Sequence, residues 1–241
     1  MSTLTIASRF MGPAGSGNGG YVCGRLAQHA GAGGDVTRVS LRRPPPLDRA
    51  LSVRQHAGGA SLSDAADLVA EGGPGDFADG PVPPVSWEQA RDAEPSYQGL
   101  VHHPFPTCFV CGTAREPGDA LCLRPGRHAP GRTACAWVPD PRLGNPDGLV
   151  APEVVWSALD CPGGWTSDLE LRPLVLATMT ACLLEPVAAG DKHVVVGQLL
   201  AEQGRKTFTT SALYDTTGRL LARAEQVWIA VDPDVFQQLT S

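Results

Sequence analysis

The sequence has no excess of positive charge, no long apolar run and no cysteine pattern typical of a disulfide framework. Its 241 residues carry a net charge of −6, which gives no electrostatic footprint for nucleic acid or an acidic membrane surface. No segment approaches the ~20 apolar residues of a membrane-spanning helix, and the N-terminus lacks the basic region and apolar core of a signal peptide. Seven scattered cysteines suit a reducing compartment better than a disulfide framework. We therefore expect a cytoplasmic protein that binds neither nucleic acid nor membrane.

The C-terminal third has the clearest secondary-structure pattern. Residues 193–201, 206–214 and 219–231 are rich in β-branched and aromatic residues, as strands are. Asp215-Thr-Thr-Gly218 lies between the last two and has the composition of a hairpin turn. Another apolar run covers residues 174–184. These segments predict an antiparallel meander.

The order of elements indicates an internal duplication. Residues 151–160 predict an amphipathic helix with Pro152 in its first turn, after a predicted strand at 132–138. The first half has the same order, with a predicted strand at 4–10 and a helix at 19–30. Further candidate strands follow at 36–41, 51–56 and within 61–71.

The pattern divides the chain into three parts. We expect a first, shortened unit at 1–71, a linker rich in proline and glycine at 72–107, and a second unit at 108–241. Inside the linker, Ser86-Trp-Glu-Gln89 has the form of a capping box and predicts one short helix.

A glycine-rich stretch, Gly12 to Gly20 (GPAGSGNGG), lies between the first predicted strand and the first predicted helix. It contains G-x-G-x-x-G, but no series of crossover helices follows, which disfavours a dinucleotide-binding domain. Glycines at a helix start let a ligand approach unpaired backbone N–H groups at the positive end of the dipole. The stretch therefore predicts a site for an anion or a developing oxyanion, with a plain flexible loop as the alternative.

Three segments of the second half carry a resemblance to a known family. Residues 108–112 read CFVCG, residues 147–165 read DGLVAPEVVWSALDCPGGW, and residues 204–224 end the set with strand-like sequence. In order and spacing they resemble the PaaI-like hotdog-fold acyl-CoA thioesterases. The resemblance covers about residues 108–231 and extends loosely, through the duplication, to the first half.

The resemblance implies an α+β fold of two hotdog units in tandem. Each unit would be an antiparallel sheet wrapped around a central helix, and the two would pair as an intramolecular pseudo-dimer. It further implies hydrolysis of an acyl thioester carried by CoA or an acyl-carrier protein, without a cofactor, and is compatible with homodimers of such chains. In the family, N–H groups at one helix start polarise the thioester carbonyl, and an acidic residue of the partner helix activates water or attacks the thioester directly.

In the second half, the family's helix-start glycines are lost but its acid is kept. Ala151, Pro152 and Glu153 occupy the His-Gly-Gly positions. Pro152 has no N–H to donate, and Glu153 would place negative charge beside an oxyanion. Asp160 falls where the family has its aspartate.

In the first half, the glycines are kept and the acid is lost. Asn18, Gly19 and Gly20 match the helix start, and Ala27 replaces the aspartate. The two halves together therefore predict one composite site, with Asn18, Gly19 and Gly20 from the first unit and Asp160 from the second. The opposite site is expected to be inactive.

Cys108 and Cys111 form a C-x-x-C pair that raises the question of a metal site. A zinc site needs four ligands, and the sequence contains one well-spaced pair, so buried structural thiols are favoured and no metal is expected.

Two other functions compete with hydrolysis. A non-catalytic acyl-CoA or acyl-binding protein of the same fold is the main alternative, because the family's histidine and one whole site are lost. An acyl-CoA hydratase or dehydratase ranks third, since no histidine lies at a predicted helix start.

Overall fold

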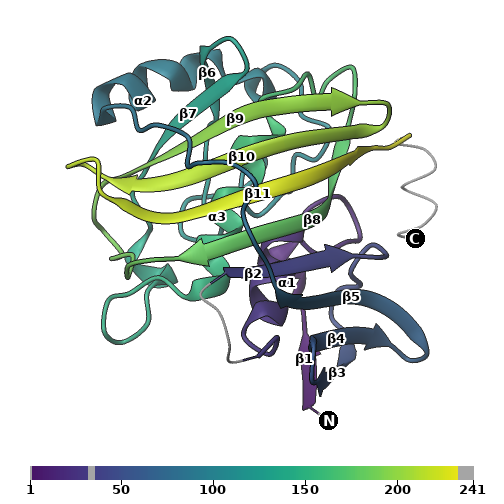
Figure 1. Cartoon of the computed structure of the whole chain (residues 1–241). Helices are drawn as coiled ribbons and strands as arrows, with labels where there is room; N and C mark the ends of the chain where they lie inside the picture. Colours follow the sequence, from purple (N-terminus) through teal and green to yellow (C-terminus); the bar gives the residue numbers. More distant parts are fainter. Residues whose placement is uncertain (1, 32–35, 233–241) are drawn as a thin grey trace.

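A computed structural model describes residues 2–31 and 36–232, and in it eleven antiparallel strands form one sheet (Figure 1). The sheet confirms the antiparallel architecture expected from the sequence. Its strands are β1 (Ser2–Thr5), β2 (Val36–Leu41), β3 (Ala50–His56), β4 (Gly59–Asp64), β5 (Asp67–Pro74), β6 (Gly126–Ala129), β7 (Arg132–Trp137), β8 (Leu174–Leu183), β9 (His193–Gln203), β10 (Lys206–Asp215) and β11 (Leu220–Ala230). The helices are α1 (Gly19–Ala27), α2 (Trp87–Ala93) and α3 (Pro152–Gly164).

The strand order is the same on both sides of the sheet's centre. The complete order is β1-β3-β4-β5-β2-β8-β11-β10-β9-β7-β6. Outward from the central β2–β8 pair, one half runs β2, β5, β4, β3, β1, and the other runs β8, β11, β10, β9, β7. Strands in the same place therefore correspond in chain order, and β6 adjoins β7 at the edge. The central pair joins Val36 to Cys182 and Ser40 to Thr178. Because α1 lies between β1 and β2 in the chain and α3 lies between β7 and β8, the two halves share one topology.

The predicted meander is confirmed for β9, β10 and β11, and its last turn has the expected geometry, whereas β8 pairs with β11 and not with its chain neighbour β9. β10 pairs with both β9 and β11, and β11 pairs with β8. Gly218 has a φ of 86°, in the left-handed region where a residue without Cβ is unstrained. Strand β6 was not predicted from the sequence.

The predicted strand at 4–10 is wrong in its second half. β1 ends at Thr5, and Ser8–Phe10 forms a short 3₁₀ turn instead. The turn brings the Phe10 ring onto Tyr21 at 3.8 Å between centroids and within 5.0 Å of Phe109, so tertiary packing overrides the extended pattern. Helix α1 likewise ends at Ala27, before the predicted end at residue 30.

Helix α3 continues beyond its predicted end at Asp160 and passes through Pro162 to Gly164. A proline inside a helix removes one backbone donor, so neighbouring groups must support that turn. Neighbouring strands hold this part of the helix by bonds to other carbonyls: Thr133 Oγ1 donates to the Pro162 carbonyl at 2.6 Å. Ser211 Oγ and Gln226 Nε2 donate to the Leu159 carbonyl at 2.6 and 2.9 Å.

Replacing Gln226 by leucine tests this support for α3. The side chain is 2% exposed, and it also donates to Ser211 and accepts from Thr209. We expect Gln226→Leu to lower the free energy of unfolding by about 2 kcal/mol, because buried polar groups lose their partners. Urea denaturation measures it, with Gln203→Leu at an exposed position as the control. Equal urea midpoints for the two variants would show that the hydrogen bonds of Gln226 do not stabilise the fold.

The segment 72–107, expected as a linker, contains the end of β5 and helix α2. The predicted capping box is confirmed: Gln89 N donates to Ser86 Oγ at 3.1 Å, and Ser86 N donates to Gln89 Oε1 at 2.9 Å. Figure 1 shows α2 beside β6 and β7, the end of the sheet far from β1. Tyr214 also fastens this segment to β10, donating to the Val82 carbonyl at 2.6 Å.

Among the described residues, no helix is both long and apolar enough to cross a membrane.

Candidate functional site

Asp160 of α3 lies against the N-terminus of α1. Its Oδ2 accepts hydrogen bonds from Asn18 Nδ2 at 2.8 Å and from Gly20 N at 2.9 Å. These residues are 140 or more positions apart in the chain, and each half of the molecule supplies one side of the site. The structure thus brings together the Asn18, Gly20 and Asp160 predicted from the sequence.

Glycine at position 20 is required by how closely the two helices approach. A Cβ on Gly20 would lie 2.7 Å from Asp160 Cβ and 2.8 Å from the Trp156 carbonyl oxygen. One turn later, a Cβ on Gly24 would lie 2.6 Å from Glu153 Cα. Both contacts are below the distance that real Cβ atoms keep, so these glycines let α1 and α3 pack backbone to backbone.

Asn18 has two roles in the same arrangement. Its Oδ1 accepts from Tyr21 N at 2.9 Å, which is the N-cap bond of α1, while its Nδ2 donates to Asp160. The side chain is 2% exposed. The amide therefore stabilises the helix start and orients the carboxylate at once.

Gly19 lies beside them with its backbone N–H at the first position of α1. Among the described residues, none accepts a hydrogen bond from this N–H, and Gly19 lines the cavity that contains Asp160. It is the helix-start donor that Asp160 leaves available.

The environment of Asp160 favours its neutral form more than water does. The side chain is 3% exposed, and its Oδ1 finds no hydrogen-bond partner in the described part of the chain. Burial raises the pKa of the Asp160 carboxyl to about 7, although the bonds from Gly20 and Asn18 favour the charged form. One buried carboxylate oxygen thus accepts two hydrogen bonds, and the other is buried without a partner among the described residues.

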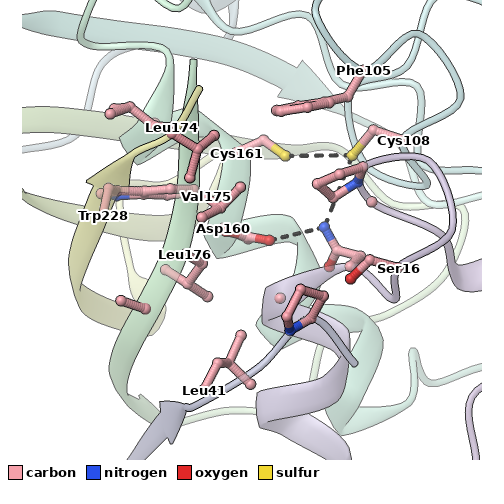
Figure 2. Close-up of a pocket in the computed structure, with 18 of the residues that line it drawn as sticks. Ser16, Leu41, Phe105, Cys108, Asp160, Cys161, Leu174, Val175, Leu176 and Trp228 are labelled. Atoms are coloured by element: carbon pink, nitrogen blue, oxygen red, sulfur yellow. Dashed lines mark hydrogen bonds between the residues drawn. The ribbon is translucent and has the colours of Figure 1, made fainter. Parts of the chain in front are cut away.

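A cavity of about 290 Å³ adjoins Asp160. Its walls are mostly apolar, and Figure 2 shows Leu174, Leu176 and Trp228 on the side opposite Cys108 and Ser16. Phe105 and His103, from the segment before the C-x-x-C pair, also contribute. An apolar cavity with few convergent polar groups is the usual form of a small-molecule site.

Three thiols border the cavity next to Asp160. Cys108 Sγ lies 3.8 Å from Cys161 Sγ and 3.9 Å from Asn18 Nδ2. Hydrogen bonds from the Cys111 and Cys161 thiols hold the pKa of Cys108 well below its usual range, whereas burial raises the pKa of Cys111. The sequence singled out the C-x-x-C pair but contained no signal that Cys161 would join it.

His103 is a cavity residue with both ring nitrogens engaged. Nδ1 accepts from Phe105 N at 2.9 Å, and Nε2 lies 3.2 Å from the Cys111 carbonyl oxygen. Neither nitrogen is free to serve as an acid or base toward a ligand.

Different residues lie at the opposite ends of the two helices, where the start of α3 meets the end of α1. Glu153, in the first turn of α3, accepts from Gln28 Nε2 at 2.8 Å and lies 3.8 Å from Arg25 Nε. Pro152 precedes it and has no N–H. A carboxylate paired with an arginine therefore occupies the place where the other site has glycine N–H groups.

Solved structures resemble this chain over nearly its whole length. The TesB protein of Mycobacterium avium subsp. paratuberculosis has a TM-score of 0.63 at 11% identity, covering 95% of this chain and 92% of that one. A candidate thioesterase of Novosphingobium aromaticivorans has a TM-score of 0.62 at 14% identity, covering 95% of both. A conserved hotdog-fold protein of Alicyclobacillus acidocaldarius has 0.58 at 12% identity, covering 96% and 93%.

In sequence, no protein-family model and no curated protein matches the chain. The structural likeness shows the fold: this is a hotdog-fold protein. The resemblance to hotdog-fold thioesterases inferred from the sequence is confirmed at that level.

Proposed function

We propose that this chain is a tandem pair of hotdog units that hydrolyses acyl thioesters at a single composite site. The shared topology of the two halves supports the tandem arrangement, with α1 and α3 as the two central helices. The observation that carries the function is the contact of Asp160 from one half with the N-terminus of α1 from the other, at the wall of an apolar cavity.

In this mechanism, Oδ1 of Asp160, the oxygen without a partner among the described residues, removes a proton from a water molecule as the water attacks the thioester carbon. Oδ2 stays bonded to Asn18 and Gly20, which hold the carboxylate in place. The proton then passes to the departing thiolate. Asp160 is the catalytic residue, and Asn18 and Gly20 are positioning residues.

The carbonyl oxygen of the thioester needs a donor as its negative charge develops. The Gly19 N–H fits that role, because it lies at the positive end of the α1 dipole and lines the cavity. The bond between Gly20 and Asp160 changes the role expected from the sequence, where both glycines were assigned to the oxyanion.

The apolar wall formed by Leu174, Leu176 and Trp228 supports an acyl group as the cavity's occupant. Arg42 and Arg43 lie at the cavity with half-exposed side chains, paired to Glu71 and Asp67. A phosphorylated carrier, such as CoA or an acyl-carrier protein, fits this distribution of apolar and basic groups.

Thiol release from a panel of acyl-CoAs and acyl-carrier-protein thioesters tests the function. We expect turnover with at least one member of the panel. A ligand-induced rise in melting temperature without any turnover would instead support the acyl-binding alternative. One observation favours that alternative: Asp160 already occupies the Gly20 and Asn18 donors.

Two substitutions of Asn18 separate its two roles. Asn18→Ser keeps a side-chain oxygen for the Tyr21 N–H but removes the amide Nδ2 that donates to Asp160, whereas Asn18→Ala loses both bonds. We expect both variants to lower kcat by about 10–100-fold, the effect of one lost bond to a charged group. Asn18→Ala should lose about 1 kcal/mol of stability in addition. Full activity in Asn18→Ser would show that Asn18 is a helix cap and nothing more.

A further inference from the structure

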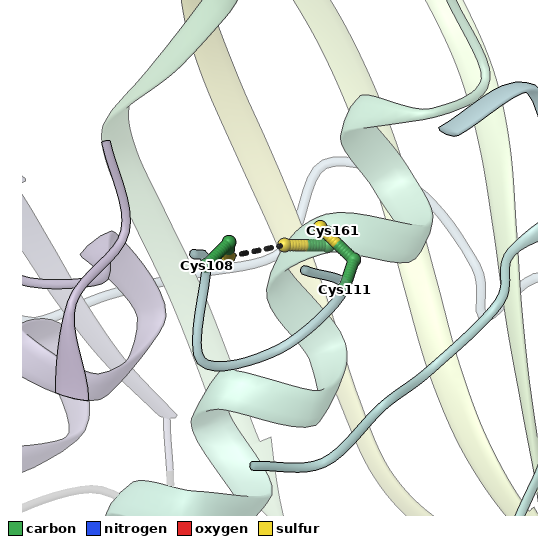
Figure 3. Close-up of side chains that lie close together, drawn as sticks. All are labelled: Cys108, Cys111 and Cys161. Atoms are coloured by element: carbon green, nitrogen blue, oxygen red, sulfur yellow. Dashed lines mark hydrogen bonds between the residues drawn. The ribbon is translucent and has the colours of Figure 1, made fainter. Parts of the chain in front are cut away.

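Three buried cysteines that line the cavity have their sulfur atoms close together (Figure 3). Cys108 and Cys111 come from the turn before β6, and Cys161 comes from α3. Their Sγ atoms all lie within 4.8 Å of one another, and those of Cys108 and Cys161 are 3.8 Å apart. Four bonds of about 2.3 Å in tetrahedral geometry around zinc place sulfurs about 3.8 Å apart. The three thiols therefore have nearly the spacing of three zinc ligands.

The turn that carries the first two cysteines is built to direct both thiols the same way. Gly112 N donates to the Cys108 carbonyl at 2.9 Å, which closes the turn. A Cβ on Gly112 would lie 2.5 Å from the carbonyl oxygens of both Cys108 and Pro106, so glycine is required after the second cysteine. A C-x-x-C turn of this kind is a common half of a zinc site.

Donor groups also point toward the sulfurs. Trp165 Nε1 donates to Cys111 Sγ at 3.4 Å, and Asn18 Nδ2 lies 3.9 Å from Cys108 Sγ. Such N–H groups stabilise thiolates, and they surround the sulfur ligands of metal sites in the same manner.

We propose that Cys108, Cys111 and Cys161 bind one Zn²⁺ as thiolates, with its fourth coordination position open to the cavity. Each thiol releases its proton as its bond to the metal forms. Zn²⁺ suits three thiolates better than hard cations do. Because all three cysteines line the cavity, a water molecule or the sulfur of a small thiol completes the tetrahedron, as in zinc sites with three protein ligands.

Elemental analysis of the full chain, loaded with zinc under reducing conditions and then gel-filtered, is the first test. We expect about one zinc per chain, and X-ray absorption should give a sulfur shell at about 2.3 Å. With Co²⁺ in place of zinc, intense thiolate-to-cobalt absorption should appear. Zinc should also protect Cys108, Cys111 and Cys161 from alkylation in the unmodified chain, as read by peptide mass spectrometry.

The variants Cys161→Ser and Cys111→Ser should weaken zinc binding by about 100-fold or more, since loss of a ligand exceeds the effect of losing a second-layer contact. Cys135→Ser is the matched control, because Cys135 is buried on β7 and lies outside the cluster. Unchanged zinc affinity in Cys161→Ser, or bound cobalt without thiolate absorption, would overturn the proposal. Equal alkylation of the three thiols with and without zinc would overturn it too, and this readout does not depend on any variant folding.

Discussion

Replacing Asp160 by asparagine is expected to lower kcat for thioester hydrolysis by about 10³-fold, within the range that a general base contributes. An asparagine at this position keeps one oxygen that can accept from Asn18 and Gly20, so the contact between α1 and α3 is preserved. What it loses is the basic oxygen that the mechanism assigns to water. Turnover of the best acyl thioester from the panel, measured at saturating substrate, gives the effect.

The same substitution should leave the fold intact or make it more stable. Asp160 Oδ1 is buried and lacks a partner among the described residues, and a buried charge without one costs free energy. We therefore expect a melting temperature for Asp160→Asn equal to or above that of the unmodified chain. If Asp160 had only a structural role, its replacement would lower both stability and activity. Lower activity together with equal or higher stability therefore indicates a catalytic role.

Asp147→Asn is the control for the loss of one carboxylate, because Asp147 lies exposed in the loop before α3. It should retain full activity and an unchanged melting temperature. If Asp160→Asn also hydrolysed the substrate at the unmodified rate, Asp160 would not be the base and the proposed mechanism would be wrong.

Replacing Gly20 by alanine is expected to lower the free energy of unfolding by about 3 kcal/mol, at the upper end of typical overpacking effects. The new methyl group would meet Asp160 Cβ at 2.7 Å and the Trp156 carbonyl oxygen at 2.8 Å. Neither group is the far end of a flexible side chain, so the helices themselves must separate. Separation lengthens the bond between Gly20 N and Asp160, and activity should fall together with stability.

Gly80→Ala provides the matched control for adding one methyl group. At that position a Cβ would have no atom of the described chain within 4 Å, so stability should change by less than about 0.5 kcal/mol. Urea denaturation of the two variants side by side measures the difference. A Gly20→Ala variant as stable as Gly80→Ala would mean that α1 and α3 can shift apart at little cost.

The strands of the C-terminal half were predictable because their signals are local. β9, β10 and β11 carry β-branched residues between clear turns, and the capping box at Ser86 predicted α2 from four residues. The extension of α3 through Pro162 was not predictable, because Thr133, Ser211 and Gln226 come from distant strands to support it.

Part of the candidate site was likewise predictable from the sequence, and part was not. The motif positions predicted that Asn18, Gly19, Gly20 and Asp160 belong together, and the structure brings Asn18 and Gly20 to Asp160; their part in catalysis stays a prediction. The sequence did not reveal that the Gly20 N–H donates to the Asp160 carboxylate and is not left free for a ligand. That outcome depends on a helix-to-helix distance that Gly20 permits but does not itself determine.

The sequence by itself determined β9, β10, β11 and α2, and which half keeps the glycines or the acid, because these depend on neighbouring residues and on composition. The tertiary structure alone decided how deeply Asp160 is buried, which of its oxygens lacks a partner among the described residues and that Cys161 meets Cys108 and Cys111. Those properties arise where α1, α3 and the C-x-x-C turn meet, and such contacts depend on the packing of surfaces far apart in the chain.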